Sequence, residues 1–188
     1  MSLFLQNLDE HNALLATLHS LDGDVQRAGQ MAAHTLQRGG KILFCGNGGS
    51  AADSQHLAAE LTGRFIKDRR PLAAIALSTD TSALTCIGND YSFDEVFARQ
   101  VAGLGRKEDL LIGISTSGNS GNVLRAVEEA HQLGMQTMGL LGRDGGKLRG
   151  LCSHSIVVPH AVTARIQECH ILIGHTLCGL IEEALGLA

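Results

Sequence analysis

The chain has 188 residues, a length that suits one well-packed domain and is short for two. Its composition, 44% hydrophobic and 18% charged, is ordinary for a water-soluble globular protein, and its 23 glycines indicate glycine loops. The net charge of −4 provides no general attraction to nucleic acid or to an anionic membrane, so any phosphate site must be local.

Cysteine usage and the first residues indicate the compartment. The chain has five cysteines and no CxxC pair, so we expect buried thiols in a reducing environment. Residues 1–10 lack the basic start and continuous apolar core of a signal peptide, and no later stretch could span a bilayer. We therefore expect a cytoplasmic protein. The cysteines are Cys45, Cys86, Cys152, Cys169 and Cys178.

Residues 2–37 repeat apolar side chains at helical spacing, with an interruption at 21–24. This pattern predicts a helical hairpin, within residues 1–38, that precedes the rest of a single domain over 1–188. A first helix in this position has little of its own domain to cover. We therefore expect it to pack against another subunit.

The remainder of the chain alternates apolar runs with helical patterns. A run at 41–45 leads into a glycine-rich loop and then a helix, which together predict a strand, a tight loop and a helix. Further strands are expected at 71–77, 109–114, 136–141 and 155–158. Further helices are expected at about 93–102, after the loop at 115–122 as far as residue 132, and at 163–184. Between these elements we expect a loop with a helix cap at 78–82, a break at 88–91 and an exposed turn at 143–147.

The strands are nearly continuous apolar runs, which is typical of a parallel sheet buried on both faces. The fold predicted is therefore α/β, a three-layer sandwich around a five-stranded parallel sheet of the Rossmann or flavodoxin kind. Ligands of such sheets bind beyond the carboxyl ends of the strands. The loops at 46–49 and 115–120 both lie there, so we expect them to converge on one ligand.

The first of these loops, Gly46-Asn47-Gly48-Gly49-Ser50-Ala51, formally matches the GxGxxG/A dinucleotide pattern. The match is weak, because a dinucleotide site requires an acidic residue at the tip of the next strand. Here Ser78 and Thr79 follow that strand, and Asp80 is better explained as a helix cap. A sugar or sugar phosphate is the preferred ligand.

The second loop, Ser115-Thr116-Ser117-Gly118-Asn119-Ser120, places four hydroxyl side chains within six residues before a helix. Together with the free amides of the helix N-terminus, they can surround a phosphate without a lysine. A capped turn needs only one Ser or Thr. The pattern therefore favours phosphate binding.

Four further side chains are candidates for chemistry. His56 and Glu60 project from one helix face, a spacing usually seen in exposed pairs, but their place just beyond the glycine loop favours a function, with Glu60 as a general base. In the closing helix, Gln167 and His175 broadly share a face but lie about 12 Å apart along the axis. They can meet one ligand only by reaching from both ends or through subunit assembly. His170 is expected to be a core histidine.

Together these stretches resemble the sugar isomerase (SIS) domain and, within it, the phosphoheptose isomerases, over nearly the whole chain. The resemblance lies in CGNGGSAADSQHLAAELTGRF at 45–65, GND at 88–90, GISTSGNS at 113–120, GRDGGKL at 142–148 and RIQECHILIGH at 165–175. It implies a homotetramer with active sites built from adjacent subunits. It also implies isomerisation of sedoheptulose 7-phosphate to D-glycero-D-manno-heptose 7-phosphate, the first step of ADP-heptose synthesis for lipopolysaccharide core or a related surface glycan.

The resemblance also implies roles for individual residues. Glu60 and His175 match the acid–base pair, and a zinc ion, one per subunit, is implied although a glutamine carbonyl is a poor zinc donor. The zinc ligands implied are His56, Glu60, Gln167 and His175. The substrate contacts implied are Asn47, Gly48, Gly49, Glu60, Asn89, Asp90, Ser115, Thr116, Ser117, Ser120 and Gln167.

The mechanism expected is an enediol isomerisation, in which Glu60 removes the C1 proton of the ketose and His175 acts at the opposite oxygen or at C2. A rival interpretation is a noncatalytic SIS module that binds a replication initiator protein. The related regulator departs at the catalytic glutamate and final histidine, and both are present here. A sugar-phosphate-sensing regulator is a second rival, against which the lack of a DNA-binding extension counts.

Overall fold

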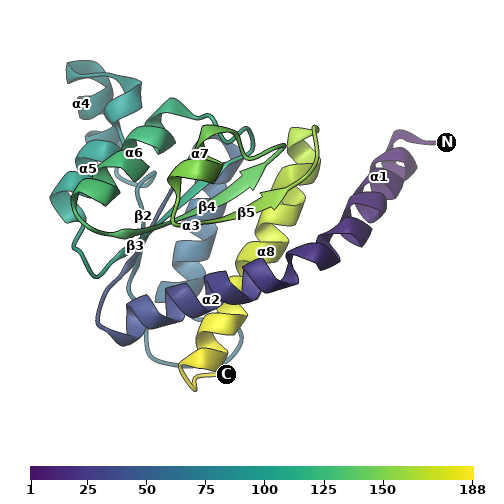
Figure 1. The fold of residues 1–188 in the computed structure, drawn as a ribbon, viewed down its shortest axis with the longest axis horizontal. Helices are drawn as coiled ribbons and strands as arrows, with labels where there is room; N and C mark the ends of the chain where they lie inside the picture. The colour runs from purple at the N-terminus through teal and green to yellow at the C-terminus, as the bar shows by residue number, and fades with distance from the viewer.

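Five strands form one parallel sheet in the spatial order β2-β1-β3-β4-β5. The computed structural model describes residues 1–188, and Figure 1 shows the sheet between layers of helices. This flavodoxin-like order reverses next to β1, so a ligand site is expected between the carboxyl ends of β1 and β3. The predicted three-layer α/β fold is confirmed. The strands are β1 (Ile42–Gly46), β2 (Ala74–Ala76), β3 (Leu110–Ser115), β4 (Gln136–Gly142) and β5 (His154–Val158).

Two hydrophobic clusters, one on each face of the sheet, produce the layers. Ile42 and Phe44 of β1 pack with α2, α3 and α8, whereas Leu43 and Cys45 pack with α5, α6 and α7. None of these four side chains is more than 3% exposed, because a strand covered on both faces alternates between two cores. The helices are α1 (Leu3–Thr17), η1 (Leu18–Leu21), α2 (Asp22–Gln37), α3 (Gly49–Thr62), α4 (Thr81–Asp90), η2 (Phe93–Glu95), α5 (Ala98–Leu104), α6 (Gly121–Gln132), α7 (Gly146–Leu151) and α8 (Thr163–Ala184).

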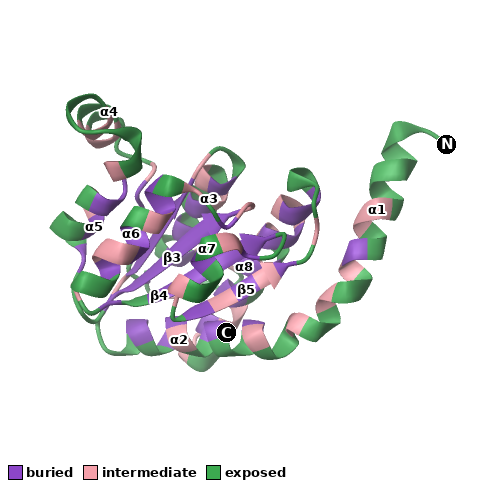
Figure 2. Cartoon of the chain, turned by 45° about the horizontal axis from the view of Figure 1, so that its top comes forward, coloured by how far each residue is buried: buried purple, intermediate pink, exposed green.

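The N-terminal helices do not form the predicted hairpin. α1, η1 and α2 follow one another as a bent rod, and the N-terminal end of α1 projects away from the sheet (Figure 1). The reason is that η1 is itself helical and carries the chain onward instead of reversing it. α1 buries only Leu14, and Figure 2 shows the rest of it as largely exposed. Leu3 and Phe4 are each 72% exposed.

Several element boundaries differ from the sequence pattern. The predicted break at 88–91 is wrong for residues 88–90, because α4 continues to Asp90 and has Tyr91 as its C-cap residue. The helix expected at about 93–102 is divided into η2 and α5. α7 begins inside the predicted turn, where Gly145 and Gly146 both adopt positive φ angles that favour glycine. By contrast, α8 has the predicted bounds, and Asp80 caps α4 by accepting a 2.9 Å hydrogen bond from the amide of Ala83.

The buried polar and sulfur groups follow the expectations in most cases. His170 is fully buried, as predicted for a core histidine. Three cysteines are buried, but Cys86 is exposed on α4 and Cys152 is half-buried. No helix combines the length and the apolarity that crossing a membrane would require.

Candidate active site

The loops that follow β1 and β3 lie side by side at the point where the strand order reverses. Asn47 in the first loop and Asn122 in the first turn of α6 exchange two amide hydrogen bonds, each 2.8 Å long. Asn122 is only 2% exposed. The reciprocal pair therefore fixes one loop against the other, as expected if both contact one ligand.

The hydroxyl groups of the second loop gather at the N-terminus of α6. Ser115 Oγ lies 2.9 Å from Ser120 Oγ and 3.5 Å from Ser117 Oγ, and it accepts a 3.1 Å bond from the amide of Gly118. Ser120 is the N-cap residue but makes no capping bond with its side chain. The amides of Gly121 and Asn122, which have no backbone partner, and the half-buried hydroxyls of Ser117 and Ser120 are thus available to an anion.

This loop is supported from behind by the turn after β4. The amide of Leu148 donates a 3.0 Å bond to the carbonyl of Gly118, and the amide of Lys147 donates a 3.1 Å bond to Asn119 Oδ1. A Cβ at Gly118 would lie 2.0 Å from the carbonyl oxygen of Gly145. Only glycine permits this close approach, so the hydroxyl loop is held in one position.

A second group of side chains forms where α3 and α8 run together. Nε2 of His56 lies 2.8 Å from Nε2 of His175 and 3.3 Å from Oε1 of Glu60. The helices approach closely because residue 174 is glycine: a Cβ there would lie 2.7 Å from the methyl carbons of Leu57. Both histidines and the glutamate come from one chain. Their grouping therefore does not depend on assembly.

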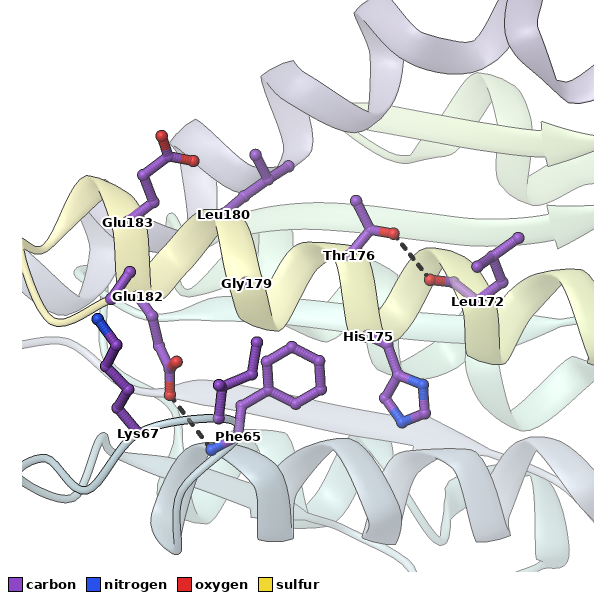
Figure 3. Close-up of a pocket in the computed structure, with 11 residues that line it drawn as sticks. Phe65, Lys67, Leu172, His175, Thr176, Gly179, Leu180, Glu182 and Glu183 are labelled. Carbon is purple, nitrogen blue, oxygen red and sulfur yellow. Dashed lines mark hydrogen bonds between the residues drawn. The ribbon is translucent and has the colours of Figure 1, made fainter.

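Phe65 covers one side of this group. Its ring stacks on the imidazole of His175, with the ring centres 5.6 Å apart and an angle of 25° between the planes. Figure 3 shows both rings between α8 and the segment after α3. A cavity of about 610 Å³ opens beside them and is lined largely by the C-terminal half of α8, with none of its lining from the glycine or hydroxyl loops. We place the chemistry at the histidine group and the loops rather than in this cavity.

The group of His56, Glu60 and His175 fits a divalent cation. Their donor atoms all lie within 4.8 Å of one another. At 2.8 Å, the two Nε2 atoms can share one proton but cannot both carry one, and a cation can replace that proton. Two imidazoles and one carboxylate are also a common donor set of catalytic metal sites with an open position.

Comparisons with known proteins agree with this architecture. The SIS domain model matches residues 6–142. Phosphoheptose isomerase from Nitratiruptor sp. is 62% identical over 160 residues, which cover 85% of this chain and 86% of the relative. Phosphoheptose isomerase 1 from Campylobacter jejuni is 56% identical over 175 residues, which cover 93% and 94%. The chain belongs to the phosphoheptose isomerase family of SIS domain proteins.

Solved structures of this family have the same fold. The phosphoheptose isomerase from Neisseria gonorrhoeae is 48% identical, with a TM-score of 0.91 and coverage of 96% of this chain and 97% of that chain. The enzyme of that name from Francisella tularensis is 39% identical, with a TM-score of 0.92 and coverage of 96% of each chain. The match therefore includes the closing helix that carries His175.

Not every residue that the family resemblance implied lies at the histidine group. Gln167 lies against the glycine loop, because a Cβ at Gly49 would be 2.3 Å from Gln167 Nε2. Gln167 is thus two turns of α8 away from His175, about 12 Å along the axis. Within one chain it is placed to contact a ligand at the glycine loop. Its role as a fourth metal ligand remains a prediction that needs a second subunit.

Asn89 and Asp90 also lie apart from the other candidates. Both are exposed at the end of α4, where Asn89 Nδ2 donates a 2.8 Å bond to Asp90 Oδ1 and Cys86 Sγ lies 3.4 Å from Asp90 Oδ2. These bonds hold the pKa of the Asp90 carboxyl below its usual value. Figure 1 shows α4 at the periphery of the molecule, so their substrate contact remains a prediction for an assembled enzyme.

The structure adds residues that the sequence did not single out. Asn122 completes the loop pair described above, and Phe65 packs on His175. Asp53 lies on α3 between the glycine loop and His56, and one of its carboxylate oxygens is buried without a partner. Burial raises the pKa of Asp53, and the nearby His56 opposes this rise. The i, i+4, i+7 spacing of Gly49, Asp53 and His56 on one helix face was the available signal.

Proposed function

We propose that the chain isomerises D-sedoheptulose 7-phosphate to D-glycero-D-manno-heptose 7-phosphate through an enediol. The observation that carries the proposal is the meeting of Glu60, on the helix α3 that follows the glycine loop, with His175 on the closing helix α8. The relatives named above are phosphoheptose isomerases. A noncatalytic regulatory module is not favoured, because it would not need this acid–base pair.

The proposed binding mode follows from the two loops. The phosphate lies against Ser115, Thr116, Ser117 and Ser120, where the amides at the start of α6 and its helix dipole favour an anion. The sugar hydroxyls extend along the glycine loop, toward Asn47, Gly48, Gly49 and Gln167. In the assembled enzyme, Asn89 and Asp90 complete the sugar contacts.

The reaction requires a proton to move from C1 to C2 of the sugar. In the proposed mechanism, the Glu60 carboxylate takes the proton from C1, and the C2 carbonyl oxygen becomes a hydroxyl of the enediol. His175, on the opposite side, donates the proton that the C2 oxygen takes up and then accepts the proton of the C1 hydroxyl. The protonated Glu60 returns its proton to C2, which leaves an aldehyde at C1 and restores both groups.

We further propose that the cation held by His56, Glu60 and His175 is zinc, with Gln167 as a fourth ligand where assembly brings it close. When bound, zinc polarises the carbonyl and hydroxyl oxygens of the substrate. Elemental analysis of the purified protein is expected to find one zinc per chain. His175→Gln is expected to lower that content, and full zinc content in this variant would exclude His175 as a ligand.

A homotetramer with active sites at subunit interfaces is proposed as the working assembly, in the cytoplasm. Support comes from α1, which exposes Leu3, Phe4 and Leu8 on a rod that projects from the domain. Light scattering is expected to give four times the chain mass.

The product would enter ADP-heptose synthesis, so loss of the protein is expected to remove heptose from lipopolysaccharide core or a related glycan.

A turnover assay tests the central proposal. Purified protein with sedoheptulose 7-phosphate is expected to form the aldose, and Glu60→Gln is expected to lower kcat by at least about 100-fold, as loss of a general base does. Glu108→Gln is the matched control, because Glu108 is exposed just before β3, at the amino-terminal ends of the strands and so at the opposite end of the sheet from the site. Full activity of Glu60→Gln would refute the assignment.

A further inference from the structure

A buried ion pair lies directly behind the proposed acid–base residues. Arg69 Nε donates a 2.7 Å hydrogen bond to Glu182 Oε1, and both side chains are only 2% exposed. Burying two charges has a large desolvation cost, which hydrogen bonds and mutual attraction must offset. A hydrophobic pair of similar size would often serve stability as well. This cost raises the question of what the pair does for the site.

The Arg69 guanidinium holds the backbone at the end of α3. Its Nη2 donates a 2.7 Å bond to the carbonyl of Glu60, and its Nη1 donates to the carbonyls of Leu61 at 2.7 Å and Gly63 at 3.0 Å. Helix ends leave such carbonyls without partners, and a residue with positive φ commonly provides the cap. Here Gly63 has φ of −84° and makes no such cap. Arg69 takes that role and fixes the backbone of Glu60 itself.

Glu182 holds the other side of the site. Besides Arg69, its Oε1 accepts a 3.2 Å bond from the backbone amide of Phe65, and Figure 3 shows this bond below α8. The Phe65 ring that this bond positions is the one stacked on His175. One carboxylate oxygen of Glu182 therefore links Arg69 to Phe65, the residue that covers His175.

We infer that Arg69 and Glu182 are positioning residues that set the geometry of both proposed acid–base groups. Arg69 fixes Glu60 by donating a hydrogen bond to the backbone carbonyl of Glu60. Glu182 fixes His175 indirectly, because it holds the backbone of Phe65, whose ring stacks on the imidazole. Neither side chain touches the substrate. The inference rests on the proposed isomerase function. It explains how two separate helices, α3 and α8, hold Glu60 and His175 in a fixed position relative to each other.

A double variant separates positioning from stability. Arg69→Met alone leaves Glu182 as an unpaired buried charge and is expected to destabilise the fold strongly, whereas Arg69→Met/Glu182→Leu removes both charges and is expected to recover stability. Positioning is not recovered, because the carbonyls of Glu60 and Gly63 and the amide of Phe65 still lack the partners that the ion pair provided. The double variant is therefore expected to unfold at a higher urea concentration than Arg69→Met, and yet to turn over substrate slowly.

The kinetic readout is the separation of kcat from KM. For the double variant we expect kcat to fall about 10- to 100-fold, since a shift of about 1 Å at reacting groups costs this much. KM for sedoheptulose 7-phosphate is expected to stay within about twofold, because the hydroxyl and glycine loops are untouched. Arg70→Met, at the exposed neighbouring arginine, is the control and should keep wild-type kinetics. Wild-type kcat in the stable double variant would overturn the inference.

A spectroscopic readout does not depend on turnover. In protein labelled with ¹³C-histidine, the His175 ring signal, assigned by its loss in His175→Gln, carries the ring-current shift of Phe65. We expect the double variant to move this signal as Phe65→Leu does, and Arg70→Met to leave it in place. If Phe65→Leu moves the signal and the double variant does not, the inference is wrong. An inactive wild-type protein would refute the proposed function, and the His175 signal would still decide whether the pair positions this ring.

Discussion

The reciprocal amide pair between Asn47 and Asn122 predicts a measurable coupling between the two ligand loops. Asn122→Ala removes two hydrogen bonds of 2.8 Å and leaves the Asn47 amide without partners in a partly buried site. Each bond is worth about 1 kcal/mol net, and an unsatisfied buried group costs roughly 1–3 kcal/mol. We therefore expect Asn122→Ala to lower the free energy of unfolding by roughly 2–4 kcal/mol.

A double-mutant cycle isolates the pair from other effects of truncation. Asn47→Ala, Asn122→Ala and the double variant are compared by urea unfolding at one chain concentration, because association would otherwise contribute to the measured stability. Once one partner is absent, removing the other should cost little. We therefore expect a coupling energy of roughly 2–3 kcal/mol, close to the cost of one single variant.

The same variants test the functional meaning of the pair. If the pair aligns the loops on one sugar phosphate, each single variant should raise KM, and the double variant should raise it no further than the worse single one. Additive unfolding energies, within about 0.5 kcal/mol, would refute the argument that these amides depend on each other. Unchanged KM in all three variants would refute the claim that they align a binding site.

Three further predictions concern the core and the glycine loop. Burial lowers the pKa of His170 from 6.5 to about 4. Between these two pH values the unfolded chain binds a proton at this histidine that the folded chain does not bind, so its contribution to stability is present above pH 6.5 and is lost as the pH falls. The free energy of unfolding should therefore decrease by about 2 kcal/mol from pH 7 to pH 5. Urea unfolding at both pH values checks this, and His170→Leu should reduce the difference. Gly49→Ala places a Cβ 2.3 Å from Gln167 Nε2, the end of a flexible side chain; we expect a several-fold rise in KM with little change in the urea midpoint, and unchanged KM would contradict a ligand role for Gln167. Leu57→Ala, at a side chain 2% exposed between α3 and α8, should cost about 2–5 kcal/mol in urea unfolding; a loss below about 1 kcal/mol would show that these helices are not held by this contact.

The sequence by itself determined the elements whose signals are local. Nearly continuous apolar runs predicted the five strands, although β2 is limited to Ala74–Ala76, and the amphipathic pattern between 163 and 184 predicted the bounds of α8. The cap at Asp80 and the hydroxyl loop at 115–120 were also visible, because capping and loop chemistry depend on neighbouring residues. The helical spacing of 2–37 was correct, but local propensity cannot show whether a short link reverses the chain or, as in η1, continues it.

Only the tertiary structure decided which distant side chains meet. His56 and His175 are separated by 119 positions and touch, whereas Gln167, on the same helix as His175, lies instead at Gly49. The Asn47 and Asn122 pair and the contacts of Arg69 with Glu60 and Glu182 likewise join segments whose own patterns do not refer to each other. Sequence periodicity gives the face on which a side chain lies, but the order of strands and the rotation of packed helices determine what that face contacts. These depend on how the whole core is filled, which no single segment encodes.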